Sequence, residues 1–415
     1  MTLQQRLTPA DGTVSDNLRL RIVQSLGSMT ALRHAWEDLE QRDPEGTIFL
    51  SWKWMEQTFR AFPGRWRVLA VWAGGRLVCV LPLKYRVHWS ERQNCLQTEL
   101  EAAGRLNYSE YVGFLCDPAF EAGAIKLIAD HLQTQPWNKL TMKYEASQNR
   151  ADVFMSCFPD SRYEIEHLSY VLNGGETDNL LCPQVDLPDS YEEYLQEKPG
   201  KNMRQKIRRF TRKYLESGSA QITWLHGPAA EKGLDILLHF WLQKWVAIKG
   251  EGPANRVAES YRHTLMQADR QGLLRLPILW LDRRPVGALG HVLDPLHRRV
   301  HFIVTGRDEN VPGNFIGPLL HSQSIRWAIE NGYRTYDFAH GNEPYKHGYG
   351  AQDVRVNFFS VRPRVAAPRS AALDPICFQN ALERLTQFLE AGDSKKALAV
   401  SRQLERLNRA GLKPT

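Results

Sequence analysis

The stretch from Tyr336 to Gly350, YDFAHGNEPYKHGYG, combines side chains that exchange protons with a backbone rich in glycine. Imidazole titrates near neutrality, so His340 is the predicted general base. Asp337 or Glu343 would orient it or act in its place. The stretch is therefore the first candidate for an acid–base site.

A structural role for the same residues stays open. Asp337, at the end of a predicted strand, also suits a turn cap or an ion pair with Arg334 or Lys346. His347 is typical of a solvated loop side chain, and glycines such as Gly341 permit left-handed turns. Composition alone does not separate the two interpretations.

A second candidate region is basic. The segment KPGKNMRQKIRRFTRKY contains eight Lys or Arg residues and almost no acidic ones. Its apolar residues recur at helical spacing, and Lys201, Arg204, Arg208 and Arg212 recur along another face. Such a face suits a phosphate-rich donor, a polyanionic glycan, tRNA or an anionic membrane surface, and it equally suits a solvated amphipathic helix.

Composition restricts the class of protein. A chain of 415 residues predicts two large domains or a duplicated fold, and a net charge of +7 indicates an anionic ligand or surface. The six cysteines form no Cys-x-x-Cys pair, so we expect reduced thiols and no metal site. Apolar runs are far shorter than a membrane span, and the first residues do not resemble a secretory signal, so we expect a cytoplasmic protein.

Hydrophobic periodicity predicts a mixed α/β fold. Helices are expected at 28–39, 51–62 and 122–133, with Ser51 as an N-cap, and a strand at 139–144. Two apolar runs joined by Ala73-Gly74-Gly75 predict a hairpin. A second hairpin aligns with it when Trp72 is placed against Trp280, which indicates a weak internal repeat.

The second half adds a strand, a glycine-bearing loop, a helix and another strand. We expect these at 299–305, 307–317, 314–331 and 334–339, with a helix also at 233–248. A helix N-terminus behind such a loop can offer backbone N–H groups to a pyrophosphate. Gly313 and Gly317 equally suit turns and packing.

These motifs together resemble a known family. FLSWKWME, VLPLKY, the basic helix, VPGNFIGPLLHSQSIRWAIENG and YDFAHGNEPYKHGYG resemble the CelD/BioF2-like branch of the GNAT acyltransferase superfamily over about residues 28–362. That branch is similar to the FemAB peptidyltransferases, which pair two GNAT-like halves. The resemblance implies tandem GNAT-like halves with mixed sheets flanked by helices, plus a C-terminal helical hairpin.

The resemblance also implies acyl transfer from acyl-coenzyme A to an amine or hydroxyl of a small metabolite or sugar. Tyr345 would assist the departing thiolate, and Lys346 would hold a phosphate or a carboxylate. The usual pyrophosphate loop reads Gln/Arg-x-x-Gly-x-Gly/Ala, and this chain keeps only its first glycine, Gly313. The predicted site residues are His340, Asp337, Glu343 and Tyr345 for catalysis, Val311, Gly313, Asn314, Phe315, Gly317 and Lys346 for the donor, and Arg204, Arg208, Trp241 and Trp245 for the substrate.

The predicted organisation is a GNAT-like half at 18–182, a second half with the active site at 183–365, and a helical tail at 366–415. Trp241 and Trp245 suit core packing as well as a pocket. By analogy with the branch, we expect a role in polysaccharide or envelope synthesis, with contact to the inner membrane or to a synthase complex. Two alternatives stay open: an aminoacyl-tRNA-dependent peptidyltransferase, and a non-catalytic subunit of a synthase complex.

Overall fold

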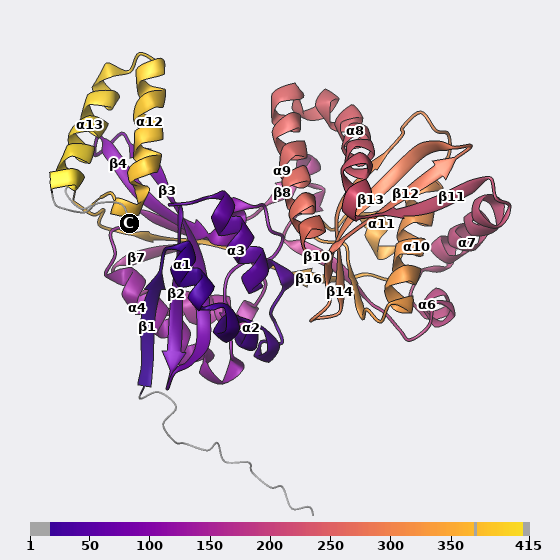
Figure 1. The fold of residues 1–415 in the computed structure, drawn as a ribbon, viewed down its shortest axis with the longest axis horizontal. Helices are drawn as coiled ribbons and strands as arrows, with labels where there is room; N and C mark the ends of the chain where they lie inside the picture. Colours follow the sequence, from indigo (N-terminus) through magenta and orange to yellow (C-terminus); the bar gives the residue numbers. More distant parts are fainter. Residues whose placement is uncertain (1–16, 369–371, 410–415) are drawn as a thin grey trace, which may run out of the picture.

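Two mixed β-sheets form the centre of the molecule (Figure 1), seen in a computed structural model that describes residues 17–368 and 372–409. The first sheet has the order β1-β2-β3-β4-β6-β17-β7, with β5 paired to β3. Its strands are β1 Leu18–Val23, β2 Trp66–Ala73, β3 Arg76–Ser90, β4 Cys95–Ala102, β5 Leu115–Cys116, β6 Lys139–Glu145, β7 Tyr163–His167 and β17 Asn357–Pro363.

The second sheet repeats the plan of the first. Four antiparallel strands are followed by a parallel strand and then by two antiparallel ones, in the order β11-β12-β13-β14-β15-β10-β16. The strands are β10 Leu181–Asp186, β11 Ala220–Leu225, β12 Leu274–Leu281, β13 Arg284–Asp294, β14 Arg299–Arg307, β15 Thr335–Asp337 and β16 Gln352–Arg355. A separate short pair consists of β8 Val171–Leu172 and β9 Thr177–Asp178.

The predicted hairpin repeat is confirmed down to its turns. Gly74 and Gly75 join β2 to β3 with positive φ angles of 53° and 91°. At the equivalent positions of the second hairpin, Asp282 and Arg283 also have positive φ angles, of 49° and 63°. Both turns thus have the left-handed geometry of tight β-hairpins, although only the first uses glycine.

The two halves exchange one strand each. β7 and β10 lie close together in the sequence, yet β10 pairs with β15 and β16 in the second sheet. β17 returns from the end of the second half and pairs with β6 and β7 in the first sheet. The predicted boundaries at 182 and 365 therefore place β17 with the wrong sheet and divide β10, because linear division of a sequence does not reveal an exchange.

Helices cover the sheets (Figure 1). In the first half they are α1 Leu26–Ala31, α2 Arg33–Arg42, α3 Trp52–Ala61, α4 Glu121–Gln133 and α5 Gln148–Ser156. In the second half they are α6 Tyr191–Glu197, α7 Lys201–Phe210, α8 Ala230–Lys249, α9 Glu251–Arg270, α10 Ile316–Glu330 and α11 Pro344–His347. The tail consists of α12 Phe378–Glu390 and α13 Ser394–Arg409.

Local sequence explains most of these helices. Ser51 caps α3 as predicted, because its hydroxyl accepts a hydrogen bond from the Trp54 N–H at 3.3 Å. The helix predicted over 28–39 is interrupted at Leu32, which ends α1 and begins α2. The predicted strand 334–339 contains only β15, because the chain turns away after Asp337 and Ala339 has a φ of 51°.

The core joins the two halves. One large cluster of buried apolar side chains includes the interior of the first half together with residues of α8 and α9, and a second cluster lies between the second sheet and α6, α7 and α10. The predicted helical tail is confirmed, and it packs on β3 and β4 (Figure 1), where the Gln403 amide bonds both backbone groups of Leu96. Within the described ranges, no helix has the length and apolarity needed to cross a membrane.

Candidate functional site

The parallel strands β14 and β15 separate near the middle of the second sheet. They pair at Arg299–Thr335, Val300–Tyr336 and His301–Asp337, after which β15 ends and β14 continues to Arg307. The first turn of α10 packs closely over the sheet at this end. A Cβ atom on Gly287 would lie only 2.4 Å from the Ile316 side chain, so this approach requires glycine.

The loop before α10 offers backbone donors. Gly313 is exposed and has a φ of +96°, a conformation that favours glycine. The N–H groups of Ile316 and Gly317 donate no backbone hydrogen bond within the described residues, and open space surrounds Gly317. Val311 and Asn314 lie in the same loop, so this segment fits an anion such as a pyrophosphate.

Phe315 has a different role from the one predicted for it. Its ring is buried and stacks on Tyr214 with centroids 4.1 Å apart. Tyr214 continues the apolar stripe of α7 into a π-helical turn, Thr211–Glu216. Phe315 therefore anchors the loop to the basic helix through packing, and its side chain does not face the open side of the loop.

Asp337 is fully buried where the strands separate. Its carboxylate accepts hydrogen bonds from the Tyr111 hydroxyl at 2.5 Å and from the Ala339 N–H at 2.8 Å, and it lies 2.9 Å from Nδ1 of His301. Burial alone would raise the pKa of Asp337, but the contacts with His301 and Tyr111 lower it. The predicted partners Arg334 and Lys346 do not contact this carboxylate; Arg334 pairs with Asp189.

His301 links this carboxylate to a second one. It is fully buried, and its Nε2 lies 4.0 Å from Asp294. Burial would lower the pKa of His301, but its contacts with Asp294 and Asp337 outweigh burial and raise it. The first half closes over this network, because the Ile48 N–H donates to Asp294 at 2.8 Å and the Phe49 ring lies 5.2 Å from that of His301.

His340 belongs to a second group between the halves. Nδ1 lies 3.2 Å from Sγ of Cys182, Nε2 lies 2.9 Å from the Glu110 carboxylate, and the ring stacks on Tyr144 with centroids 3.6 Å apart. Burial would lower the pKa of His340, but Cys182 and Glu110 raise it to about 10. At neutral pH this imidazole is already protonated, which is unlike the free base that the sequence predicts.

The Lys346 ammonium makes its contacts within the stretch 336–350. Its ammonium donates to the carbonyl oxygens of Phe338, His340 and Gly341 at 3.0, 2.9 and 2.7 Å and lies 2.9 Å from the Glu343 carboxylate. An ammonium has three N–H donors, so none remains for a phosphate. Lys346 and Glu343 therefore fix the shape of the stretch.

Tyr345 remains accessible. Its side chain is 42% exposed, and its ring centroid lies 6.0 Å from that of His321. It is the most exposed residue of the predicted catalytic set, although burial of its hydroxyl raises the pKa of that group. Its predicted role beside a leaving group stays compatible with this position.

The predicted substrate residues lie apart from this region. Arg204 donates to the Pro199 carbonyl at 3.1 Å, and the exposed Arg208 pairs with Glu192 at 3.1 Å. Trp241 is buried in the core and its ring lies 5.9 Å from that of the half-buried Trp245. The structure therefore assigns the tryptophans to packing, and leaves the basic face of α7 open to solvent.

The family of the second half follows from its sequence. Residues 201–347, from α7 to α11, match the family model described as acetyltransferase (GNAT) domain. The second half contains a GNAT domain. No curated protein matches the chain in sequence.

Solved structures extend this result to the fold of most of the chain. The crystal structure of FemX is similar over 79% of this chain and 95% of its own, with a TM-score of 0.56 and 10% identity. A tandem GNAT protein from the clavulanic acid biosynthesis pathway covers 84% and 100%, with a TM-score of 0.45 and 13% identity. L-PGS from Bacillus licheniformis covers 70% and 83%, with a TM-score of 0.41 and 11% identity. The predicted tandem GNAT-like, FemAB-like fold is confirmed.

Four residues of this region escaped the sequence analysis. Glu110 and Tyr111 come from the first half and reach the GNAT domain across more than 200 positions of sequence, for which no local signal exists. His301 sits in an ordinary strand pattern, HFIVT, and Cys182 in a short apolar run. The one available signal was the hairpin repeat, because the strand that follows the second hairpin, β14, then corresponds to β4 of the first half.

Proposed function

We propose that this chain moves an acyl group from acyl-coenzyme A to an amine or hydroxyl of a small metabolite or sugar. The observation that carries the proposal is the opened strand pair β14–β15 in the GNAT domain, with the His340–Glu110 ion pair beside it between the halves. The rings of His301 and His340 both lie within 6 Å of Tyr111, at 5.6 and 5.8 Å, so the two groups adjoin.

The geometry changes the expected acid–base roles. The acceptor's amine or hydroxyl attacks the thioester carbonyl and loses a proton, and the Glu110 carboxylate is the group positioned to receive it. The His340 imidazolium stays charged and stabilises negative charge nearby. The tetrahedral oxyanion then collapses, the thiolate leaves, and the Tyr345 hydroxyl donates to the departing sulfur.

The donor would be held by the loop before α10. Backbone N–H groups of Ile316 and Gly317 suit the pyrophosphate of coenzyme A, and the positive φ of Gly313 shapes the turn that exposes them. A Gly313→Val variant should stay folded but bind coenzyme A at least about tenfold more weakly. Isothermal calorimetry measures this, and unchanged affinity in the folded variant removes the loop from the donor site.

The catalytic assignment is tested by replacing Glu110. Glu110→Gln should lower thiol release from acetyl-coenzyme A, with a panel of amines and sugars as acceptors, by about 10²- to 10⁴-fold, while coenzyme A affinity stays unchanged. His340→Gln should give a similar defect because the charged pair acts as a unit. The exposed Glu259 on α9 provides the matched control, Glu259→Gln. Wild-type turnover in Glu110→Gln would contradict the assignment.

The basic face of α7 favours the second candidate, aminoacyl transfer from tRNA. Lys201, Arg208 and Arg212 are exposed there. In this case Arg208→Glu combined with Arg212→Glu should abolish a gel shift with tRNA and leave coenzyme A binding intact. A role in polysaccharide or envelope synthesis, catalytic or as a binding subunit, rests on the resemblance to the CelD/BioF2-like branch. Mass spectrometry of ligands retained by the purified protein separates these readings.

A further inference from the structure

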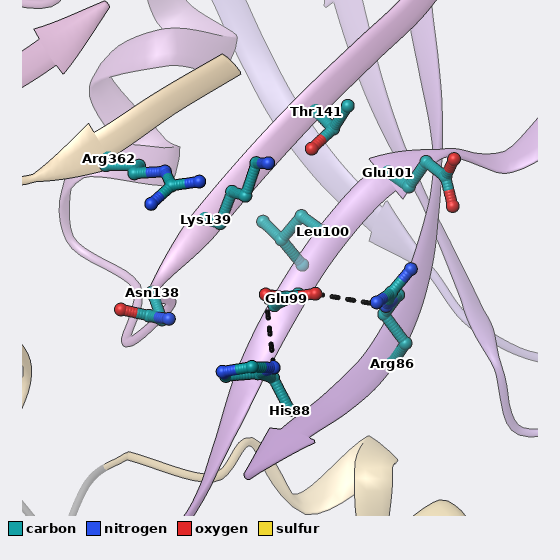
Figure 2. Close-up of a pocket in the computed structure, with 9 residues that line it drawn as sticks. All are labelled: Arg86, His88, Glu99, Leu100, Glu101, Asn138, Lys139, Thr141 and Arg362. Carbon is teal, nitrogen blue, oxygen red and sulfur yellow. Dashed lines mark ion pairs between the residues drawn. The ribbon is translucent and has the colours of Figure 1, made fainter. Parts of the chain in front are cut away.

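A polar cavity of about 320 Å³ lies on one face of the first sheet (Figure 2). Its size matches the lower end of sites for small molecules. It is lined by Arg86, His88, Glu99, Leu100, Glu101, Asn138, Lys139, Thr141 and Arg362. The side chains come from β3, β4, the start of β6 and β17.

Strand register arranges the charges in a row. Arg86 on β3 pairs with Glu99 on β4, and Glu99 pairs with Lys139 on β6. The pairing of Val361 with Leu140 places the next residue of β17, Arg362, across from Lys139. Two positive side chains from neighbouring strands thus extend into the same cavity, as Figure 2 shows.

The acidic residues of the cavity are already paired. Glu99 lies 3.0 Å from Arg86 and 3.9 Å from His88, and Glu101 lies 2.9 Å from Lys84. These contacts leave Lys139 and Arg362 without an ion-pair partner in the described part of the chain. Glu164 faces Arg362 from β7, but the two side chains form no ion pair.

Like charges opposite each other across strands destabilise a sheet. An anion between Lys139 and Arg362 would remove this repulsion, and Asn138 and Thr141 add neutral hydrogen-bond donors at the edge of the same cavity. A guanidinium beside an ammonium suits an oxyanion with several acceptor oxygens. We infer that this cavity binds the phosphate group of a phosphorylated small molecule.

This site is distinct from the proposed donor site. The cavity belongs to the first sheet, whereas the loop at Gly313 belongs to the GNAT domain. The inference therefore stands whether or not the chain transfers acyl groups. It assigns a ligand to the half of the molecule that the GNAT family match does not cover.

Thermal unfolding in increasing inorganic phosphate tests the inference on the full chain. Phosphate should raise the melting temperature of the wild type, and calorimetry should give a dissociation constant that Lys139→Gln with Arg362→Gln weakens by about tenfold or more. The matched control is Lys53→Gln, which removes an exposed charge on α3 and should respond to phosphate as the wild type does.

The melting temperature measured without phosphate provides a second test, in which the substitution should not destabilise the protein. Without phosphate, Arg362→Gln should melt at the same temperature as the wild type or higher, because it removes the repulsion from Lys139. A cooperative unfolding transition of the variant without phosphate also shows that the variant folds. The inference is overturned if phosphate does not stabilise the wild type, if it stabilises the double variant equally, or if malonate binds as tightly as phosphate, which would indicate a dicarboxylate site.

Discussion

The parallel strand pairs of the two halves share one register but have opposite surroundings. In the first sheet Glu99 and Glu101 pair with Lys139 and Thr141, and in the second sheet Arg299 and His301 pair with Thr335 and Asp337. Glu101 and His301 are thus equivalent positions. The first lies beside an open polar cavity, whereas the second is fully buried.

The side chains that cover each strand pair, more than the backbone register, make the two surroundings different. Phe49 and Tyr111 of the first half close over the His301–Asp337 pair, while the matching face of the first sheet has no such cover over its cavity. A charged pair in the buried position loses its hydration, and its electrostatic attraction is stronger because the surrounding dielectric is low. The same pair in the open position stays weak and available to a ligand.

The exchanged strands give the largest expected effect. A chain that ends at residue 356 lacks β17, so β7 loses its partner strand in the first sheet and β6 keeps only β4, and the chain should show no cooperative unfolding. A chain that ends at residue 368 keeps both sheets and loses only the helical tail, so it should retain a cooperative transition. Circular dichroism during heating compares the two. A cooperative transition in the shorter chain would contradict the coupling of the halves.

Breaking the buried His301–Asp337 pair should lower the free energy of unfolding far more than breaking the Arg86–Glu99 pair at the open cavity. Asp337→Asn removes the nearer of the two carboxylates that the fully buried His301 contacts, so we expect a loss of about 3–5 kcal/mol in the free energy of unfolding. Glu99→Gln breaks a pair whose arginine, Arg86, is 52% exposed at the open cavity, and should change it by about 0–1 kcal/mol. Urea denaturation measures both. Equal costs would show that burial does not separate the two pairs.

The pH dependence of stability should arise mainly between the halves. His340 has a folded pKa of about 10, above the unfolded value of about 6.5, so its contribution is complete below pH 6.5 and is lost as the pH rises toward 10. The free energy of unfolding should fall by on the order of 2–4 kcal/mol over this range.

The His340→Gln variant isolates this contribution. Lys143 and Glu145, whose pKa values lie near 8, titrate in the same interval and remain in the variant. The difference between the wild-type and variant curves should therefore shrink as the pH rises. A difference that stays constant from pH 6 to 10 would assign His340 a purely packing role.

The smallest effect is expected at the surface of the GNAT domain. Arg208 and Glu192 are about half and two thirds exposed, at 51% and 64%, so their ion pair contributes little. Arg208→Glu should change the free energy of unfolding by about 0.5 kcal/mol or less. A loss above about 1 kcal/mol in chemical denaturation would show that the basic face supports the fold.

Local signals predicted the elements of the fold well. The cap at Ser51, the turn at Gly74 and the hairpin repeat depend on neighbouring residues and are present as expected. The strand β17 was not predicted, and the boundary at 365 assigned its residues to the second half although its partners on β6 and β7 lie about 200 positions earlier. Neighbouring residues determine whether a segment forms a strand, but they do not determine which strand it pairs with.

The contacts among the candidate site residues could not be predicted from the sequence. Asp337, Glu343 and Lys346 do converge around one stretch, yet Lys346 bonds carbonyl groups of that stretch and Asp337 bonds Tyr111 from the first half. The protonation of His340 depends on Glu110, which only the packing of the halves brings near. Side-chain type gives the chemistry that is available, and tertiary contacts decide the charge state.

The strand exchange also sets an order for biosynthesis. A ribosome completes β7 roughly 190 residues before it begins β17, and this interval lasts about 10–40 s at about 5–20 residues per second. During that time the nascent first sheet exposes the edges of β6 and β7, which can pair with strands of other chains. The half that is translated first therefore completes its sheet last. Crowded polysomes or delayed chaperones should cause more misfolding of this protein than of one with self-contained halves.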